Sequence, residues 1–403
     1  MAPIKAQTLK GFRDFEPQEA RKRQYIISWL RPVFESYGFE PLETPALEYE
    51  EVLLGKYGDE GDKLMYRFVD KGGRKVALRY DQTVPLARYI AQNYQTIAFP
   101  FKRYQIQPVW RAENTQKGRY REFLQCDIDT VGTASETADA EIITIVSDCY
   151  KALGFKKVTV LLNDRSLFKD LPAKALIILD KLKKIGPEKV RAELKSKGFD
   201  EKILEQFKAK KATKYLETVV SLAQKMGVNK ESMVFEPTLA RGLDYYTSLI
   251  IEVEVENYKS GSVGGGGRYD NLIGTFANKG VPAVGFSFGF DRIMEAMEEQ
   301  KLFPQELNDS TTKVLVTVFP EYEKQSMELV SKLRNAGINA ELYLQEAKLD
   351  KQLKYADRKG IPYIAVIGPK EAKENVVTIK TLKTGKQEKL TVEQLITIFK
   401  ITE

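Results

Sequence analysis

One stretch of this sequence gathers cations at one end of a predicted strand and carboxylates at the other. Residues 119–132 read RYREFLQCDIDTVG and residues 101–113 read FKRYQIQPVWRAE, and both patterns predict strands. The short polar loop between them indicates a long antiparallel hairpin. Because side chains alternate along a strand, every second residue lies on one face. The members of that face are Arg119, Arg121, Phe123, Gln125, Asp127 and Asp129.

This face suits a ligand that is anionic at one end and cationic at the other. If the face is buried without a partner, each unpaired charge carries a large desolvation cost. Phosphates suit the arginine end, Phe123 offers a ring for stacking, and an ammonium group or a cationic ring suits Asp129. A solvated sheet face with cross-strand ion pairs explains the same pattern equally well.

A second group of candidate residues lies in the segment ARGLDYYTS, which brings Arg241, Asp244, Tyr245 and Tyr246 close together. An arginine beside two tyrosine hydroxyls can orient a polar substrate through hydrogen bonds. A pair of core tyrosines whose hydroxyls bond to the backbone would give the same local sequence.

Two further signals involve glycine. Gly264 to Gly267 precede Arg268, but no Gly-Lys-Ser/Thr follows, so this is not a Walker-type phosphate loop. The run favours a hairpin turn, with a close backbone approach to a ligand as the alternative. Arg292 lies just inside a predicted helix after several glycines, where it either contacts a nucleotide or is a solvated surface residue.

Composition excludes several kinds of chemistry. None of the 403 residues is histidine, which removes Ser-His-Asp and Cys-His catalysis and histidine-ligated zinc. The two cysteines, Cys126 and Cys149, exclude a disulfide framework and favour a reducing, cytoplasmic location. No apolar run is long enough to span a bilayer, so we expect no membrane partner. A net charge of +7 fits either a polyanionic partner or simply a lysine-rich surface.

The spacing of apolar residues predicts the helices and strands that must position these side chains. Residues 17–37 have helical spacing that ends at Gly38, and Pro32 predicts a kink or a break in that helix. Ser135 is the expected N-cap of a helix that runs to about Leu153. The last part of the chain alternates strands and helices, which indicates an α/β domain with a mainly parallel core.

The pattern predicts an α+β domain with an antiparallel sheet, a helical insertion and a C-terminal α/β domain. The expected boundaries are 1–163 and 234–303 for the α+β domain, 164–233 for the insertion, 304–312 for a linker, and 313–403 for the C-terminal domain.

Taken in order, these stretches resemble the class II aminoacyl-tRNA synthetases, and among them the histidyl-tRNA synthetases. GFEPLETPALE resembles the dimer-forming motif 1, VWRAENTQKGRYREF motif 2, and GFSFGFDRI motif 3. ARGLDYY and GGGRYDNL resemble the two signatures that separate the histidine family from its relatives, and KGFRDFEP and LRYDQTVPLARY its N-terminal elements. YADRKGIPYIAVIG is similar to the anticodon-binding domain. The resemblance covers nearly the whole chain.

The resemblance implies a role for each matching residue. Arg111 and Arg241 would be the catalytic arginines. ATP would be bound by Arg111, Glu113, Arg119, Arg121, Phe123 and Arg292. Histidine would be bound by Asp81, Gln82, Thr83, Arg111, Gln125, Asp129, Arg241, Tyr245 and Tyr246. Mg²⁺ would bridge the ATP phosphates, with Glu113 or Asp127 as open candidates for its protein ligands.

The reaction implied is activation of histidine with ATP to histidyl-adenylate, followed by transfer to the 3′ end of tRNA-His. Motif 1 implies a C₂ homodimer. The alternatives are a non-charging paralogue that regulates the first enzyme of histidine biosynthesis, an RNA-binding sensor on the same fold, and another class II specificity. If the chain charges histidine, its lack of histidine suggests a further hypothesis: it could still be translated when charged histidyl-tRNA is exhausted. Chance or deliberate redesign explains the absence equally well.

Overall fold

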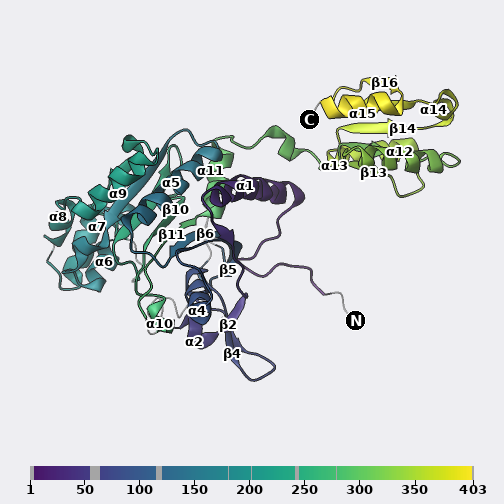
Figure 1. The fold of residues 1–403 in the computed structure, drawn as a ribbon. Coiled ribbons are helices and arrows are strands. Elements are labelled where there is room, and N and C mark those ends of the chain that lie inside the picture. The colour runs from purple at the N-terminus through teal and green to yellow at the C-terminus, as the bar shows by residue number, and fades with distance from the viewer. Residues whose placement is uncertain are drawn as a thin grey trace. The chain divides into compact units, whose positions relative to one another are not determined.

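The computed structural model contains two compact units (Figure 1). The first unit comprises Met1–Asp14 and Arg23–Leu302, and the second Phe15–Lys22 and Phe303–Glu403. The structure describes residues 4–54, 64–114, 120–179, 181–200, 202–240, 245–277 and 279–401.

An eight-stranded sheet forms the centre of the first unit. In spatial order its strands are β1 (Glu40–Pro41), β5 (Phe101–Trp110), β6 (Glu122–Val131), β11 (Ala283–Phe288), β10 (Gly264–Arg268), β9 (Leu249–Val255), β7 (Val158–Asp164) and β8 (Met233–Phe235). Only the outer pairs β1–β5 and β7–β8 are parallel. The predicted antiparallel sheet is therefore confirmed, and β5 pairs with β6 along its whole length as expected.

One face of this sheet is apolar and is covered by helices. Cys126 and Ile128 of β6 are fully buried on it. The ring of Phe34 packs 5.5 Å from the ring of Phe288, measured between centroids. The covering helices include α1 (Pro17–Ser36), α5 (Glu136–Ala152) and α11 (Phe290–Glu299).

The helix ends agree with the sequence in most respects. Ser135 caps α5, since its side chain accepts a hydrogen bond from the backbone of Thr137, and the helix ends at the predicted place. Gly38 follows α1 with a φ of 76°, a left-handed conformation that glycine adopts without strain. Of the kink or break predicted at Pro32, the break is wrong, because α1 continues through this residue as one helix.

The expectation of a turn at the glycine run is also wrong. Gly264–Arg268 forms β10, a buried central strand between β11 and β9. A Cβ atom at Gly266 would lie 2.1 Å from the carbonyl oxygen of Gly285 on β11. Glycine is needed here because the neighbouring backbone leaves no room for a side chain.

The first unit also holds a three-stranded sheet and the helices of the predicted insertion. The small sheet has the order β2 (Leu47–Tyr49), β4 (Lys75–Leu78), β3 (Arg67–Val69). The remaining helices are α2 (Glu50–Leu53), α4 (Thr83–Asn93), α6 (Ala173–Leu179), α7 (Leu182–Ser196), α8 (Ile203–Lys208), α9 (Lys214–Lys225) and α10 (Gly274–Ala277). Helices α6 to α8 share a hydrophobic core with Leu161 of β7 and Ile250 of β9.

The second unit contains a five-stranded sheet. Its order is β13 (Ala340–Leu342), β12 (Val314–Val316), β14 (Tyr363–Val366), β15 (Val377–Thr381), β16 (Gln387–Leu390). The first three strands are parallel as predicted, whereas β15 and β16 add antiparallel pairs that the sequence pattern did not reveal. Its helices are α12 (Glu323–Asn335), α13 (Leu349–Lys359), α14 (Pro369–Glu374) and α15 (Val392–Ile401).

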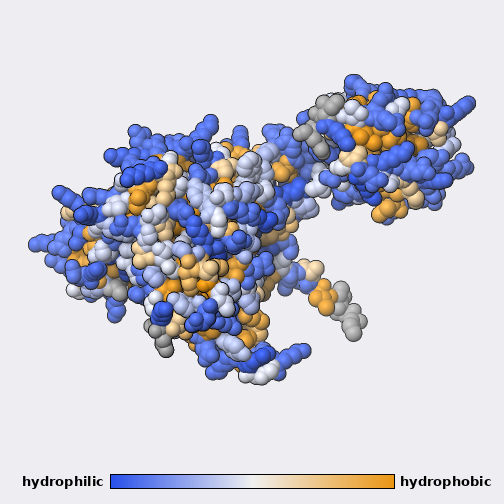
Figure 2. Space-filling model, viewed as in Figure 1, coloured by the Kyte–Doolittle hydropathy of each residue, from blue (hydrophilic) through white to orange (hydrophobic). Residues whose placement is uncertain are grey.

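Hydrophilic side chains cover most of the face drawn in Figure 2. Several exposed apolar side chains lie on the small three-stranded sheet, namely Leu47, Tyr49, Phe68 and Val69. Within the part of the chain that the structure describes, no helix has the length and apolar character needed to cross a membrane.

Candidate active site

Two adjoining cavities lie on the polar face of the large sheet. The larger has a volume of about 700 Å³ and the smaller about 200 Å³. Arg111, Gln125, Gly265 and Ser287 line both cavities, so these residues mark the junction. The arrangement suits a large ligand and a small one whose reacting ends meet beside Arg111.

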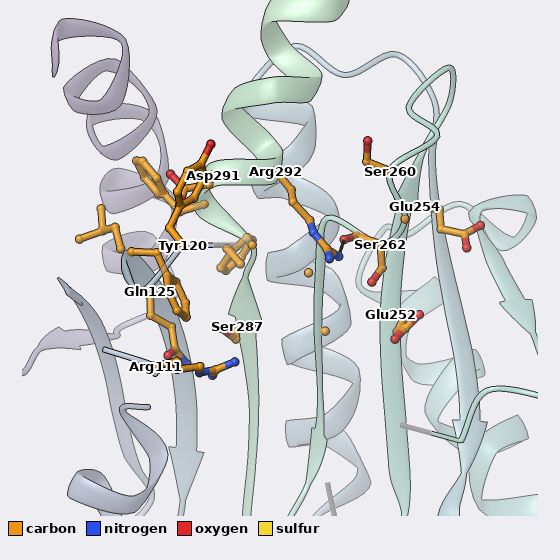
Figure 3. A pocket seen from close by; sticks show the side chains of 18 of the residues that line it. Arg111, Tyr120, Gln125, Glu252, Glu254, Ser260, Ser262, Ser287, Asp291 and Arg292 are labelled. Carbon is orange, nitrogen blue, oxygen red and sulfur yellow. Dashed lines mark hydrogen bonds between the residues drawn. The ribbon is translucent and has the colours of Figure 1, made fainter. Parts of the chain in front are cut away.

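The larger cavity contains arginine and aromatic side chains. Figure 3 shows Arg111 and Gln125 from the hairpin on one side and Arg292 from α11 above. The guanidinium carbon of Arg111 lies 5.1 Å from the ring centroid of Phe123. Arg292 donates a hydrogen bond of 2.7 Å to the carbonyl of Ser262. Glu113, Phe123 and Arg292 all line this cavity, which therefore offers cations for phosphates and a ring for a base.

The smaller cavity is acidic and aromatic. Its lining includes five of the residues that the family resemblance assigns to histidine binding, namely Asp81, Thr83, Asp129, Tyr245 and Tyr246. The rings of Tyr245 and Tyr246 pack with their centroids 4.7 Å apart. Carboxylates beside aromatic faces suit a small cationic or ammonium-bearing ligand.

The floor of the smaller cavity carries a buried charge network. Asp127 and Asp129 are each 3% exposed, so the solvated-face interpretation is wrong for this end of β6. A cross-strand ion pair is nevertheless present, because a nitrogen of Arg103 on β5 lies 2.7 Å from Oδ2 of Asp129. Burial raises the pKa of Asp127 to about 7 and that of Asp129 to about 6, while the nearby Arg103 opposes both shifts.

Four predicted site residues are not placed in either cavity. Arg119 and Arg241 lie outside the described residues, although Ala240 lines the larger cavity and Tyr245 the smaller. Arg121 is half-buried, and its guanidinium donates to the carbonyls of Glu113 and Lys10. Gln82 is buried and ties the start of α4 to the hairpin, since its amide donates to the carbonyls of Gln107 and Gln125.

The sequence analysis missed several residues that line the cavities or support them. Arg103 lies opposite Asp129 in the hairpin, and strand alternation could have found it once the register was known. Glu252 and Glu254 on β9 line the larger cavity and alternate in the segment IIEVEVEN. Tyr269 and Ser287 line the smaller cavity as well; they lie in the quoted motifs GGGRYDNL and GFSFGFDRI, but neither residue was singled out.

Known structures share this architecture. The structure of a histidyl-tRNA synthetase from Nostoc sp. PCC 7120 superposes with a TM-score of 0.84 at 30% identity, covering 100% of both chains. The apo enzyme from S. aureus gives a TM-score of 0.73 at 24% identity and covers 98% of this chain, a likeness of fold. The large antiparallel sheet, its covering helices and the separate C-terminal unit are the class II aminoacyl-tRNA synthetase fold.

Sequence comparison narrows the class to one family. The family model described as histidyl-tRNA synthetase matches residues 11–201 and 197–293, and an anticodon-binding domain model matches residues 313–401. A histidine–tRNA ligase from Cytophaga hutchinsonii is 42% identical over 96% of this chain and 98% of its own length. One from Wolinella succinogenes is 41% identical over 96% of each chain. This chain belongs to the histidyl-tRNA synthetase family.

Proposed function

We propose that this chain activates histidine with ATP and transfers the histidyl group to the 3′ end of tRNA-His. The single observation that carries the proposal is the junction of the two cavities at Arg111. A nucleotide-sized cavity that holds Arg111 and Arg292 and a small acidic cavity meet there, and the reaction requires a phosphate and a carboxylate at one point.

The proposed roles of the residues follow their placement. In the larger cavity Arg111, Glu113, Phe123 and Arg292 bind ATP, with Phe123 and Arg292 against the adenine ring. In the smaller cavity the histidine is bound by Asp81, Thr83, Gln125, Asp129, Tyr245 and Tyr246. Gln82 supports this wall through the hairpin backbone. Arg119, Arg121 and Arg241 keep their proposed phosphate roles on the family resemblance alone.

The proposed chemistry is in-line attack of the histidine carboxylate on the α-phosphorus of ATP, with pyrophosphate as the leaving group. Arg111 holds the two reacting anions together and offsets the charge that spreads over the phosphate oxygens in the transition state. Its guanidinium is fixed for this task, because Nε donates a 2.9 Å hydrogen bond to the carbonyl of Tyr80. Positioning and fixed positive charge suffice, so the absence of histidine from the chain is no obstacle.

Mg²⁺ is proposed to enter with ATP and to neutralise part of the phosphate charge. Proteins usually hold this ion through one or two carboxylates together with substrate phosphates. Glu252 and Glu254 line the larger cavity and supply that donor set, as does Glu113 at the other wall. The other candidate, Asp127, lines the smaller cavity instead.

The remaining proposals concern assembly and location. Residues 1–163 and 234–303 would act as the catalytic domain, 164–233 as an insertion, 304–312 as a linker and 313–403 as the anticodon-binding domain. The exposed apolar side chains of the small sheet, which includes residues of motif 1, support a homodimer. We propose a cytoplasmic location, because Cys126 and Cys149 are free thiols and a reducing compartment keeps them so.

The test is ATP–pyrophosphate exchange with purified protein, Mg²⁺ and a panel of amino acids. Exchange that depends on histidine supports the proposal, and exchange with another amino acid keeps the class but overturns the specificity. Folded protein that gives no exchange at all would favour the non-charging paralogue. In the same assay Arg241→Ala should lower the rate of adenylate formation by orders of magnitude while the protein remains folded.

A further inference from the structure

One acidic side chain in the wall of the larger cavity has no role in the proposed reaction. Four carboxylates line this cavity in the described part of the chain, namely Glu113, Glu252, Glu254 and Asp291. The three glutamates are the candidate ligands of Mg²⁺. Asp291 lies in the first turn of α11, and its negative charge would repel the phosphates of a nucleotide bound in the cavity. A site for a polyanion needs this charge to be offset.

Two arginines offset the charge of Asp291. Nη2 of Arg13 lies 3.1 Å and Nη1 of Arg23 lies 3.0 Å from the same carboxylate oxygen, Oδ1. Neither arginine is among the described residues that line the cavity, so both act from behind its wall. The side chains of Arg13, Arg23 and Asp291 are 24%, 12% and 13% exposed, so salt and water screen these pairs less than they would on an open surface. Together the three side chains carry one net positive charge.

Arg13 is held in place by the neighbouring hairpin. The backbone N–H of Arg121 donates a 2.9 Å hydrogen bond to the carbonyl of Gly11, two residues before Arg13. The guanidinium carbon of Arg13 lies 3.2 Å from the ring centroid of Tyr120, a stacked contact. Tyr120 and Asp291 both line the larger cavity, and Figure 3 labels both at one side of it. Arg13 therefore joins the chain that leads into β6 to the start of α11 at this wall.

The two arginines differ in what else they contact. Arg23 belongs to α1, and its guanidinium carbon lies 4.9 Å from the ring centroid of Phe290 on α11. Its loss would also disturb the packing of α1. Arg13 precedes that helix and has the more exposed side chain of the two. Its replacement should therefore change the charge at the cavity with less effect on the fold.

We infer that Arg13 is a positioning residue for ATP, which neutralises Asp291 and so allows the wall formed by Tyr120 and α11 to accept the triphosphate. It acts through Asp291 rather than on the nucleotide itself. This inference rests on the proposed function and deepens it by giving the N-terminal segment a task in ATP binding.

The first measurement is the binding of radiolabelled ATP with Mg²⁺ by equilibrium dialysis, which does not require turnover. Arg13→Met should raise the Kd about tenfold, since one unit charge about 10 Å from the phosphates has roughly this effect at an effective dielectric constant of about 20. Arg191→Met on α7 is the matched control. Arg191 is likewise partly exposed and pairs with Glu188 and Glu205, and its loss should change the Kd less than about twofold.

The double variant Arg13→Met with Asp291→Asn separates charge from packing. It loses the Arg13 side chain as the single variant does, but it also loses the negative charge that Arg13 offsets. Its Kd for ATP should return to within about threefold of the wild-type value. The single variant Asp291→Asn, which keeps both arginines, should bind ATP at least as tightly as the wild type. An unchanged Kd in Arg13→Met, no recovery in the double variant, or weaker binding by Asp291→Asn would overturn the inference.

Pyrophosphate exchange distinguishes a failure of this inference from a failure of the proposed function. Wild-type protein that binds ATP but gives no histidine-dependent exchange would refute the proposed function, and the dialysis results would still decide the role of Arg13. Where exchange is present, Arg13→Met should raise the KM for ATP by about the same factor as the Kd and change the KM for histidine less than about threefold.

Salt supplies a readout that a merely structural role would not move. The difference in ATP Kd between Arg13→Met and the wild type should shrink as the ionic strength rises from about 0.05 M to about 0.5 M, because salt screens charges but not packing contacts. A difference that salt leaves unchanged, or an equal rise in the KM for histidine, would contradict the electrostatic role of Arg13.

Discussion

Replacing Arg268 with methionine tests how the active-site sheet is joined to the helices behind it. Arg268 on β10 is 3% exposed, and its Nη2 lies 2.8 Å from Oδ1 of Asp139 on α5, which is fully buried. The guanidinium also donates to the carbonyl of Thr133, and Oδ2 of Asp139 accepts a hydrogen bond from Tyr215 on α9. Removing one partner of such a buried pair costs about 3–5 kcal/mol, because the other charge is left uncompensated.

The loss should depend on pH, and its sign follows from Asp139. Burial raises the pKa of Asp139 to about 6, and Arg268 opposes that rise. Without Arg268 the native carboxyl binds its proton still more tightly than the unfolded chain does. In the window above about pH 6, Asp139 of the native Arg268→Met variant is then protonated, whereas Asp139 of the unfolded variant is ionised. The free energy of unfolding of the variant therefore falls as the pH rises. The limiting slope is about 1.4 kcal/mol per pH unit.

The assay is urea unfolding followed by tryptophan fluorescence at pH 5.5, 7 and 8. The two tryptophans of the chain, Trp29 and Trp110, both lie in the first unit, so the signal reports that unit. Arg67→Met, at a surface ion pair with Glu50, is the control and should cost less than about 1 kcal/mol at any pH. The double variant Asp139→Asn with Arg268→Met should lack the extra slope. A loss below about 1 kcal/mol at pH 8, or an equal loss at pH 5.5 and pH 8, would refute the reasoning.

Three other outcomes are expected. Gly266→Ala should destabilise the first unit by about 1–3 kcal/mol or more in the same fluorescence assay, because its Cβ would lie 2.1 Å from the Gly285 carbonyl. Gly280→Ala, whose Cβ meets nothing within 4 Å, should stay within about 0.5 kcal/mol, and equal effects would contradict the packing argument. Arg292→Met should raise the KM for ATP by about tenfold or more in pyrophosphate exchange and leave that for histidine nearly unchanged; the reverse pattern would place Arg292 elsewhere. Under histidine starvation, synthesis of this histidine-free chain should persist while a variant with several added histidine codons stalls. Equal stalling of both would remove the hypothesis of continued translation.

Local sequence patterns predicted the helices and strands that depend on interactions between residues close together in the chain. The alternation in residues 119–132 predicted β6, the polar loop predicted its hairpin with β5, and Ser135 predicted the start of α5. The alternation of side chains along a strand and the capping of a helix depend on residues a few positions apart, so both can be predicted from the sequence alone. The ordered family motifs extended this to the fold class.

The errors arose where distant segments decide. Gly264–Arg268 resembles a turn when read alone, and it becomes a strand because β9 and β11 lie too close for side chains.

The charged residues of the smaller cavity could likewise be predicted only in part from the sequence. From the sequence it follows that Gln125, Asp127 and Asp129 share one face of a strand. Which carboxylate pairs with Arg103 depends on strand register, because register places Arg103 opposite Asp129 and Gly285 on its other side. The sequence alone thus determined which side chains share one face of the strand. Their partners were decided only by tertiary structure, since hydrogen bonds and ion pairs form between side chains that the fold brings together across many residues of chain.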